Sequence, residues 1–196
     1  MNESKVVQWL GMICLLAGIA RIGMTPTAYI WGTDSIPELI FGYIACILMS
    51  VGTIAIYQVQ SRETGVLGFI STLAMIIGNI MTTALVFTVF IMDPASFSVV
   101  ADNLVVVISR MGGMIGLTLG TLVFAIVTFR AKVFPRWVPF LNVLMIVSMF
   151  LPLADNKLFA LFWGLTYVGM GFCIWTGKLK PRAQQEQIDM NNTVGA

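Results

Sequence analysis

The chain has 196 residues, of which 58% are hydrophobic and only 10% are charged, and its formal net charge is +2. Soluble domains average about 25% charged residues. A mean hydropathy of +0.92 leaves more apolar side chains than the core of a water-soluble protein of this length can hide. The composition argues against a soluble domain, and so small a net charge indicates no nucleic-acid partner.

Apolar stretches separated by short polar segments predict an all-α fold, a polytopic bundle of transmembrane helices that uses residues 1–180 as one domain. The polar segment 181–196 is expected to be a disordered cytoplasmic tail. Six spans are expected, at residues 6–24, 37–58, 66–92, 108–129, 137–153 and 158–177.

The segments between the spans predict the connections. Residues 25–35 are expected to form a loop and residues 60–65 a polar turn. A straight helix over residues 94–129 would be about 54 Å long at 1.5 Å per residue, well beyond a hydrocarbon core of about 30 Å. We therefore expect residues 94–107, including Asp102, to lie at the membrane surface.

The first span has a second interpretation, a signal peptide that is cleaved. Lys5 would be its basic start, and the small residues at 18–20 resemble a cleavage site. Its apolar run is at the long limit for a signal peptide, and further spans follow it. We interpret it as a retained span, with cleavage as the alternative.

The distribution of lysine and arginine predicts the orientation. With both termini in the cytoplasm, eight basic residues lie inside and three outside, as the positive-inside rule favours. The inner residues are Lys5, Arg62, Arg130, Lys132, Arg136, Lys178, Lys180 and Arg182, and the outer ones are Arg21, Arg110 and Lys157.

Two of the outer arginines are candidate site residues. By helical rise, Arg21 and Arg110 lie at a similar depth, near the outer edge of the hydrocarbon. They could extend to the interface, where a long basic side chain is tolerated. Alternatively, they could face inward and pair with Glu38, Asp102 or Asp34, which would line an anion-binding vestibule.

A polar face is expected in the middle of the third span. Asn79 shares one side of a helix with Thr72 and Thr83. Because an unpaired amide is unfavourable in lipid, this side should turn into the bundle. It could hold helices together, or it could line a cavity.

A ladder of glycines is the most specific local pattern. Gly112, Gly116 and Gly120 recur every four residues and strip one helix face of side chains, so that another backbone can approach closely. The partner could be another helix of the same chain, or this face could join the chain to a second copy or to another subunit.

Residues that commonly carry catalysis are scarce. The chain has no histidine, which excludes a histidine acid–base pair, a histidine-ligated haem and a His-Glu-x-x-His zinc site. Cys14, Cys46 and Cys173 lie in apolar runs without Cys-x-x-Cys spacing, so we interpret them as buried hydrophobic residues. We expect no metal and no cofactor, and an enzyme is disfavoured.

Residues 116–143, GLTLGTLVFAIVTFRAKVFPRWVPFLNV, combine a glycine-bearing helix, a short basic turn and a Pro-Arg-Trp start of the next helix. This pattern resembles small bacterial multi-pass membrane proteins of unknown function, over about the last 80 residues. The resemblance implies a bundle of six or seven helices in the bacterial cytoplasmic membrane. It implies no catalytic residue.

These patterns lead to two functional hypotheses. The first is a non-enzymatic membrane protein that acts as an accessory or interaction subunit, with the lipid bilayer as its surroundings. The alternative is a small-solute transporter or channel lined by Arg21, Arg110 and Asn79. A polar cavity joining the arginines to Asn79 would distinguish the second from the first.

Overall fold

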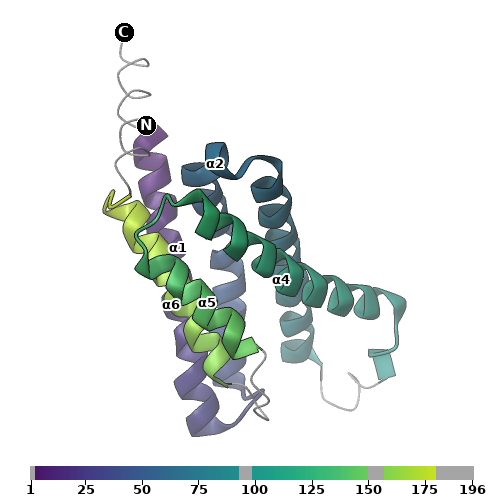
Figure 1. Ribbon diagram of the computed structural model, residues 1–196. Coiled ribbons are helices and arrows are strands. Elements are labelled where there is room, and N and C mark those ends of the chain that lie inside the picture. Colours follow the sequence, from purple (N-terminus) through teal and green to yellow (C-terminus); the bar gives the residue numbers. More distant parts are fainter. Residues whose placement is uncertain (1–2, 93–98, 150–156, 180–196) are drawn as a thin grey trace.

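The computed structural model describes residues 3–92, 99–149 and 157–179, and all regular secondary structure in this part is helical (Figure 1). The all-helical prediction is confirmed for this part of the chain. Four of the described helices are long and apolar enough to cross a membrane, and the apolar α5 is shorter. The helices are α1 (Glu3–Trp31), α2 (Ile36–Ile91), α4 (Leu104–Ala131), α5 (Trp137–Met149) and α6 (Lys157–Trp175).

Helix α2 combines the second and third predicted spans in one element that reverses direction at Gly65. This residue has φ 53° and ψ −142°, a conformation open to glycine because it has no Cβ. Residues 36–64 form the first arm and residues 66–91 the second arm, and the two arms run in opposite directions (Figure 1).

The polar turn predicted at residues 60–65 is wrong except for its last residue. The first arm stays helical up to Thr64, and Gln60 is fully buried. The Gln60 side-chain amide donates a hydrogen bond to the Thr128 hydroxyl at 3.1 Å, and the Thr64 hydroxyl donates to the Gln60 carbonyl at 2.8 Å. These two donors have partners in the protein and do not require water, whereas the Gln60 side-chain oxygen has no partner among the described residues.

The loop predicted at residues 25–35 is also too long, because α1 continues through Pro26 to Trp31. A proline inside a helix removes a backbone donor and disturbs the hydrogen bonds of the preceding turn. The Thr27 hydroxyl lies within hydrogen-bonding distance of two carbonyls of that turn, those of Gly23 at 2.8 Å and Met24 at 2.9 Å. These carbonyls lie in the turn that the proline disturbs, although the carbonyl that loses its donor is that of Ile22, four residues before Pro26.

Helix α4 begins four residues before the fourth predicted span. Asn103 caps it, with its side-chain oxygen accepting from the Val105 amide at 3.0 Å, and Asp102 and Asn103 are exposed as expected. Three predicted parts lie outside the described residues. They are the start of the surface segment at residues 94–98, the end of the fifth span at residues 150–153 and the tail at residues 181–196.

Helix α1 packs against α6 and α2, while α2 also packs against α4, and α5 packs mainly against α6. The start of α1, the Gly65 bend, the end of α4 and the end of α6 lie together at the upper side of Figure 1. The exposed basic residues near these four ends are Lys5, Arg62, Arg130, Lys132 and Lys178. The loop at residues 32–35 and the end of the second arm lie at the opposite side.

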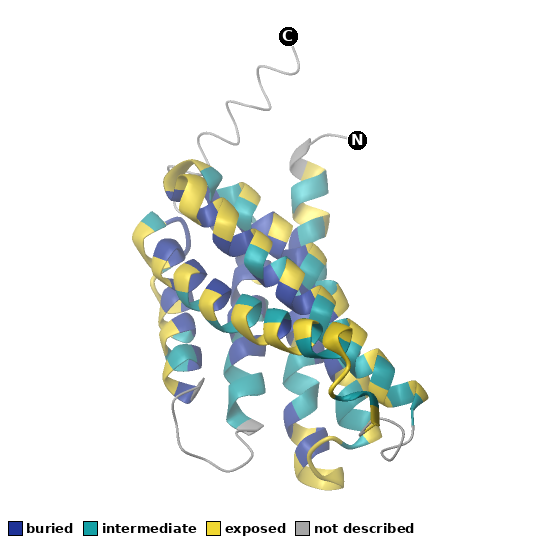
Figure 2. Ribbon diagram, turned by 90° about the vertical axis from the view of Figure 1, so that its right-hand side faces the viewer, coloured by how far each residue is buried: buried dark blue, intermediate teal, exposed yellow. Residues whose placement is uncertain are grey.

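Buried residues face the interior of the bundle and exposed residues its outside (Figure 2). The exposed residues include large apolar side chains on every described helix. Exposed apolar surface on this scale is unfavourable in water and is typical of a surface that contacts lipid. Examples are Ile19, Val66, Met114, Phe140 and Trp175, each at least 48% exposed.

Glycines bring α1 and α6 into close antiparallel contact. A Cβ added at Gly18 would lie 2.5 Å from the Gly164 carbonyl oxygen, and one at Gly164 would lie 2.6 Å from the Gly18 carbonyl oxygen. Gly11 and Gly171 lie seven residues, about two helical turns, away from Gly18 and Gly164. They make the same kind of contact, because a Cβ at Gly171 would lie 2.7 Å from the Gly11 carbonyl oxygen. This spacing of seven is visible in the sequence but did not enter our prediction.

Candidate functional site

Arg21 lies among three helices, in a cluster that we call the Arg21 site: Arg21 of α1, Thr53 of the first arm of α2, and Trp163 and Tyr167 of α6. The Arg21 guanidinium carbon lies over the indole ring of Trp163, 4.2 Å from its centroid. The Tyr167 hydroxyl is hydrogen-bonded to the Thr53 hydroxyl at 2.8 Å. Trp163 and Tyr167 are four residues apart and therefore share one face of α6.

Two donors in this site lack an acceptor. Arg21 as a whole is partly buried, but its Nε is fully enclosed and has no hydrogen-bond partner in the described part of the chain. Trp163 is 2% exposed, and its indole N–H is likewise enclosed and unpaired there. A buried polar group without a partner costs about 1–3 kcal/mol, so this pair of donors requires an explanation.

The charges around Arg21 come from its own bundle. Glu38 at the start of the first arm is the carboxylate that interacts electrostatically with Arg21. Glu38 is partly buried, and one of its carboxylate oxygens accepts a hydrogen bond from the Asp34 amide at 2.7 Å. Arg21 therefore has the inward orientation and lies near one of the acids considered for it.

Arg110 and Asp102, the other members of the predicted vestibule, lie elsewhere. Both are exposed. Arg110 belongs to α4 and Asp102 lies just before this helix, which packs mainly against α2. The structure thus brings Arg21 and Glu38 into one neighbourhood and leaves Arg110 and Asp102 on the surface.

Asn79 is fully buried in the second arm of α2. Its amide nitrogen donates to the Met75 carbonyl at 3.0 Å, one turn earlier, and its side-chain oxygen has no partner among the described residues. The Thr83 hydroxyl donates to the Asn79 carbonyl at 2.7 Å, and Thr72 is nearly buried. This polar face is therefore turned into the bundle.

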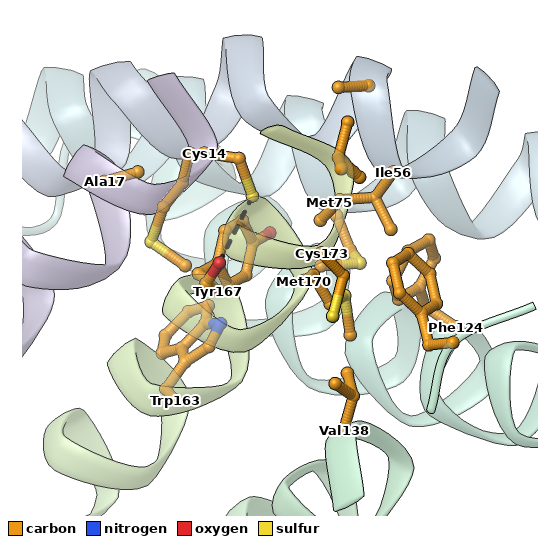
Figure 3. Close-up of a cluster of buried hydrophobic side chains, with 14 of the residues drawn as sticks. Cys14, Ala17, Ile56, Met75, Phe124, Val138, Trp163, Tyr167, Met170 and Cys173 are labelled. Atoms are coloured by element: carbon orange, nitrogen blue, oxygen red, sulfur yellow. Dashed lines mark hydrogen bonds between the residues drawn. The ribbon is translucent and has the colours of Figure 1, made fainter. Parts of the chain in front are cut away.

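A hydrophobic cluster connects the Arg21 site to the residue that Asn79 contacts. Met75, whose carbonyl Asn79 contacts, belongs to the same buried cluster as Trp163 and Tyr167. Figure 3 shows Met170 and Met75 among the side chains that fill its middle. Methionine side chains are flexible and fill irregular spaces well, so this cluster packs the helices together with apolar side chains.

The glycine ladder contacts α2 of the same chain. A Cβ at Gly116 would lie 2.7 Å from the Ala74 carbonyl oxygen and 3.0 Å from the Gly78 Cα, and one at Gly120 would lie 3.1 Å from the Met75 amide nitrogen. A Cβ at Gly112 would meet the Met81 sulfur. The second arm of α2 therefore occupies this face.

All three cysteines are buried and free. The Cys14 thiol donates to the Tyr167 carbonyl at 3.5 Å, and this contact ties α1 to α6 beside the Arg21 site. Within residues 3–92, 99–149 and 157–179, no group of three or more histidine, cysteine, aspartate or glutamate side chains could hold a metal ion.

Sequence reasoning identified Arg21 but missed its aromatic partners. Trp163 and Tyr167 are separated from Arg21 by most of the chain, and the available signal was a pair of amphipathic aromatic residues one turn apart in an apolar helix. The site holds a guanidinium, an indole and two hydroxyls, a set suited to binding or to helix packing. Comparisons of the chain with family models, with curated proteins and with solved structures found no match.

Proposed function

We propose that the protein is an integral protein of a bacterial cytoplasmic membrane that crosses it six times with both ends in the cytoplasm. The two arms of α2 supply two antiparallel spans, and α1, α4 and α6 supply three more. Helix α5, which is apolar and 13 residues long as described, supplies the sixth together with the residues after it. The resemblance of residues 116–143 to bacterial multi-pass proteins supports the choice of membrane.

The position of the basic residues supports the orientation. The helix ends that carry Lys5, Arg62, Arg130 and Lys178 lie on one side of the bundle, which the positive-inside rule places in the cytoplasm. Reporter enzymes fused after Arg62 and after Arg130 should be active inside the cell, and a reporter fused after Asp34 should be active outside. The opposite pattern at any of these positions would overturn the topology.

We propose that the protein acts in the membrane as a non-enzymatic accessory or interaction subunit. The observation that carries this proposal is the buried hydrophobic cluster around Met75 and Met170, whose members come from α1, α2, α4, α5 and α6 and pack these helices against one another. Because α2 of the same chain fills the glycine face, a partner subunit must bind to another surface.

A small-solute transporter or channel is the second candidate, favoured by the enclosed position of Arg21. An ionisable side chain that faces the interior of a membrane bundle is typical of a substrate or ion pathway. A transport cycle would require the hydrophobic cluster to open between the Arg21 site and Asn79.

Anion flux from proteoliposomes distinguishes the two candidates. Vesicles loaded with chloride and diluted into sodium gluconate are followed with a chloride electrode, for the wild type, Arg21→Gln and Arg110→Gln, with protein-free vesicles as the blank. An accessory subunit should give no flux above the blank. A channel or transporter that uses Arg21 should give a flux that Arg21→Gln abolishes and Arg110→Gln, which alters an exposed arginine, leaves intact.

A further inference from the structure

The two unpaired donors of the Arg21 site belong to side chains that lie against each other. Arg21 Nε–H and Trp163 Nε1–H are both enclosed, and the guanidinium carbon is 4.2 Å from the indole centroid. Neither group has a lone pair to offer, because arginine and tryptophan side chains only donate hydrogen bonds. Whatever completes this pair must therefore be an acceptor.

We propose that Arg21 and Trp163 together bind a small monovalent anion of about the size of chloride, which accepts a hydrogen bond from each. An anion suits the site because Arg21 brings a positive charge into a region screened from water, where an opposite charge is strongly stabilising. A water molecule would satisfy the donors but would leave this charge in place.

Surrounding side chains limit the size and charge of the occupant. Trp163 is 2% exposed, and the ring of Phe159 packs against it with centroids 5.1 Å apart, so a single atom fits this environment better than an extended molecule. Glu38 interacts electrostatically with Arg21 and offsets part of its charge, so a monovalent occupant suits the site better than a divalent one. A divalent anion such as phosphate would leave excess negative charge in the bundle.

The bound anion would lie between α1 and α6, the two helices that Gly18 and Gly164 bring together. It would link their side chains at the level of Arg21 and so stabilise the folded bundle. This role does not depend on transport, since an anion can be held without being released across the membrane.

Thermal unfolding of the detergent-solubilised full chain tests the inference. The melting temperature is measured in sodium chloride and in sodium gluconate at equal concentration, because gluconate is too large for the site. At a chloride concentration 100 times its dissociation constant, the melting temperature should rise by about 5 °C or more. The response should disappear in Arg21→Gln and remain in Arg110→Gln.

Trp163→Phe is the more discriminating variant, because it keeps an aromatic ring under Arg21 while it removes the N–H donor together with part of the ring volume. It should fold and lose most of the chloride response. It keeps the inference testable even if Arg21→Gln fails to fold. An identical melting temperature of the wild type in the two salts, or a full chloride response in Trp163→Phe, would overturn the proposal.

A crystal grown in sodium bromide supplies the direct measurement. We expect an anomalous peak within hydrogen-bonding distance of both Arg21 Nε and Trp163 Nε1. A site occupied only by water, or by a Glu38 carboxylate that has turned toward Arg21, would contradict it. Chloride stabilisation without chloride flux would support the anion site and exclude the transporter, so the two conclusions can fail separately.

Discussion

The contact between the glycine ladder and α2 leads to a quantitative prediction. In Gly116→Ala the added methyl would lie 2.7 Å from the Ala74 carbonyl oxygen and 3.0 Å from the Gly78 Cα, whereas ordinary contacts start at 3.4 Å. Both neighbours are backbone atoms and cannot rotate away. Helix α4 must therefore move off the second arm by roughly half an ångström, a gap that forfeits about a quarter of each dispersion contact it opens.

Gly112→Ala is the matched control. Its methyl would meet the Met81 sulfur, which lies at the end of a flexible side chain that can adopt another rotamer. Both variants gain the same helix propensity, about 1 kcal/mol for alanine over glycine, so this term cancels when the two are compared. The difference between them isolates the packing at Gly116.

Gly116→Ala should be less stable than Gly112→Ala by about 1–3 kcal/mol, the usual penalty for overpacking. For a chain of this size this difference corresponds to a melting temperature lower by about 2–12 °C. The measurement is thermal unfolding in detergent, followed by circular dichroism. Equal melting temperatures, or a less stable Gly112→Ala, would refute the close approach of α4 to α2 that we describe.

Three further outcomes are expected. Thr27→Val removes the hydroxyl that bonds to carbonyls beside Pro26, so amide exchange after the proline should quicken, whereas Thr88→Val, which loses a similar bond on an exposed surface, should have little effect there. Tyr167→Phe removes the buried bond to Thr53 and should destabilise the bundle by about 0.5–1.5 kcal/mol in unfolding experiments; an unchanged stability would contradict that bond. The three buried cysteines should resist maleimide in the folded protein and react after unfolding in sodium dodecyl sulfate, and rapid labelling of the folded protein would contradict their burial.

The ends of a helical segment could be predicted to within a few residues where they depend only on hydrophobic run length and local backbone geometry. The third predicted span, 66–92, nearly coincides with the second arm of α2 at residues 66–91, which begins after Gly65. The ends of such a span are visible in the local sequence, because an apolar run is bounded there by glycine or by a charged residue. The prediction that the ladder around Gly116 lets a backbone approach closely is also local, because it depends only on the absence of side chains.

Errors arose where a polar or breaking residue finds a partner that the pattern does not display. A proline such as Pro26 often ends a helix, but α1 continues past it, and the neighbouring Thr27 hydroxyl bonds to carbonyls of the disturbed turn. The polar side chain of Gln60 led to the prediction of a turn, but it is hydrogen-bonded to Thr128, which lies 68 residues away in the sequence. A distant partner of this kind cannot be recognised from one sequence without knowing which helices touch.

The Arg21 site shows the same division. The depth of Arg21 along α1 could be estimated from helical rise, and this estimate put a charged residue near the outer edge of the hydrocarbon. Whether Arg21 extends to the interface or turns inward depends on α6, which supplies the Trp163 ring. Arg110, at a similar estimated depth, is exposed, so depth alone does not determine the orientation of an arginine.

The sequence by itself determined that this chain is helical and apolar enough for a membrane, because composition and hydrophobic run length depend on each residue's own transfer free energy. Only the tertiary structure decided which helix fills the glycine face, that Arg21 turns toward Trp163, and that residues from five helices form one buried hydrophobic cluster. These outcomes depend on contacts between residues far apart in the chain, and such contacts are set by how whole helices pack.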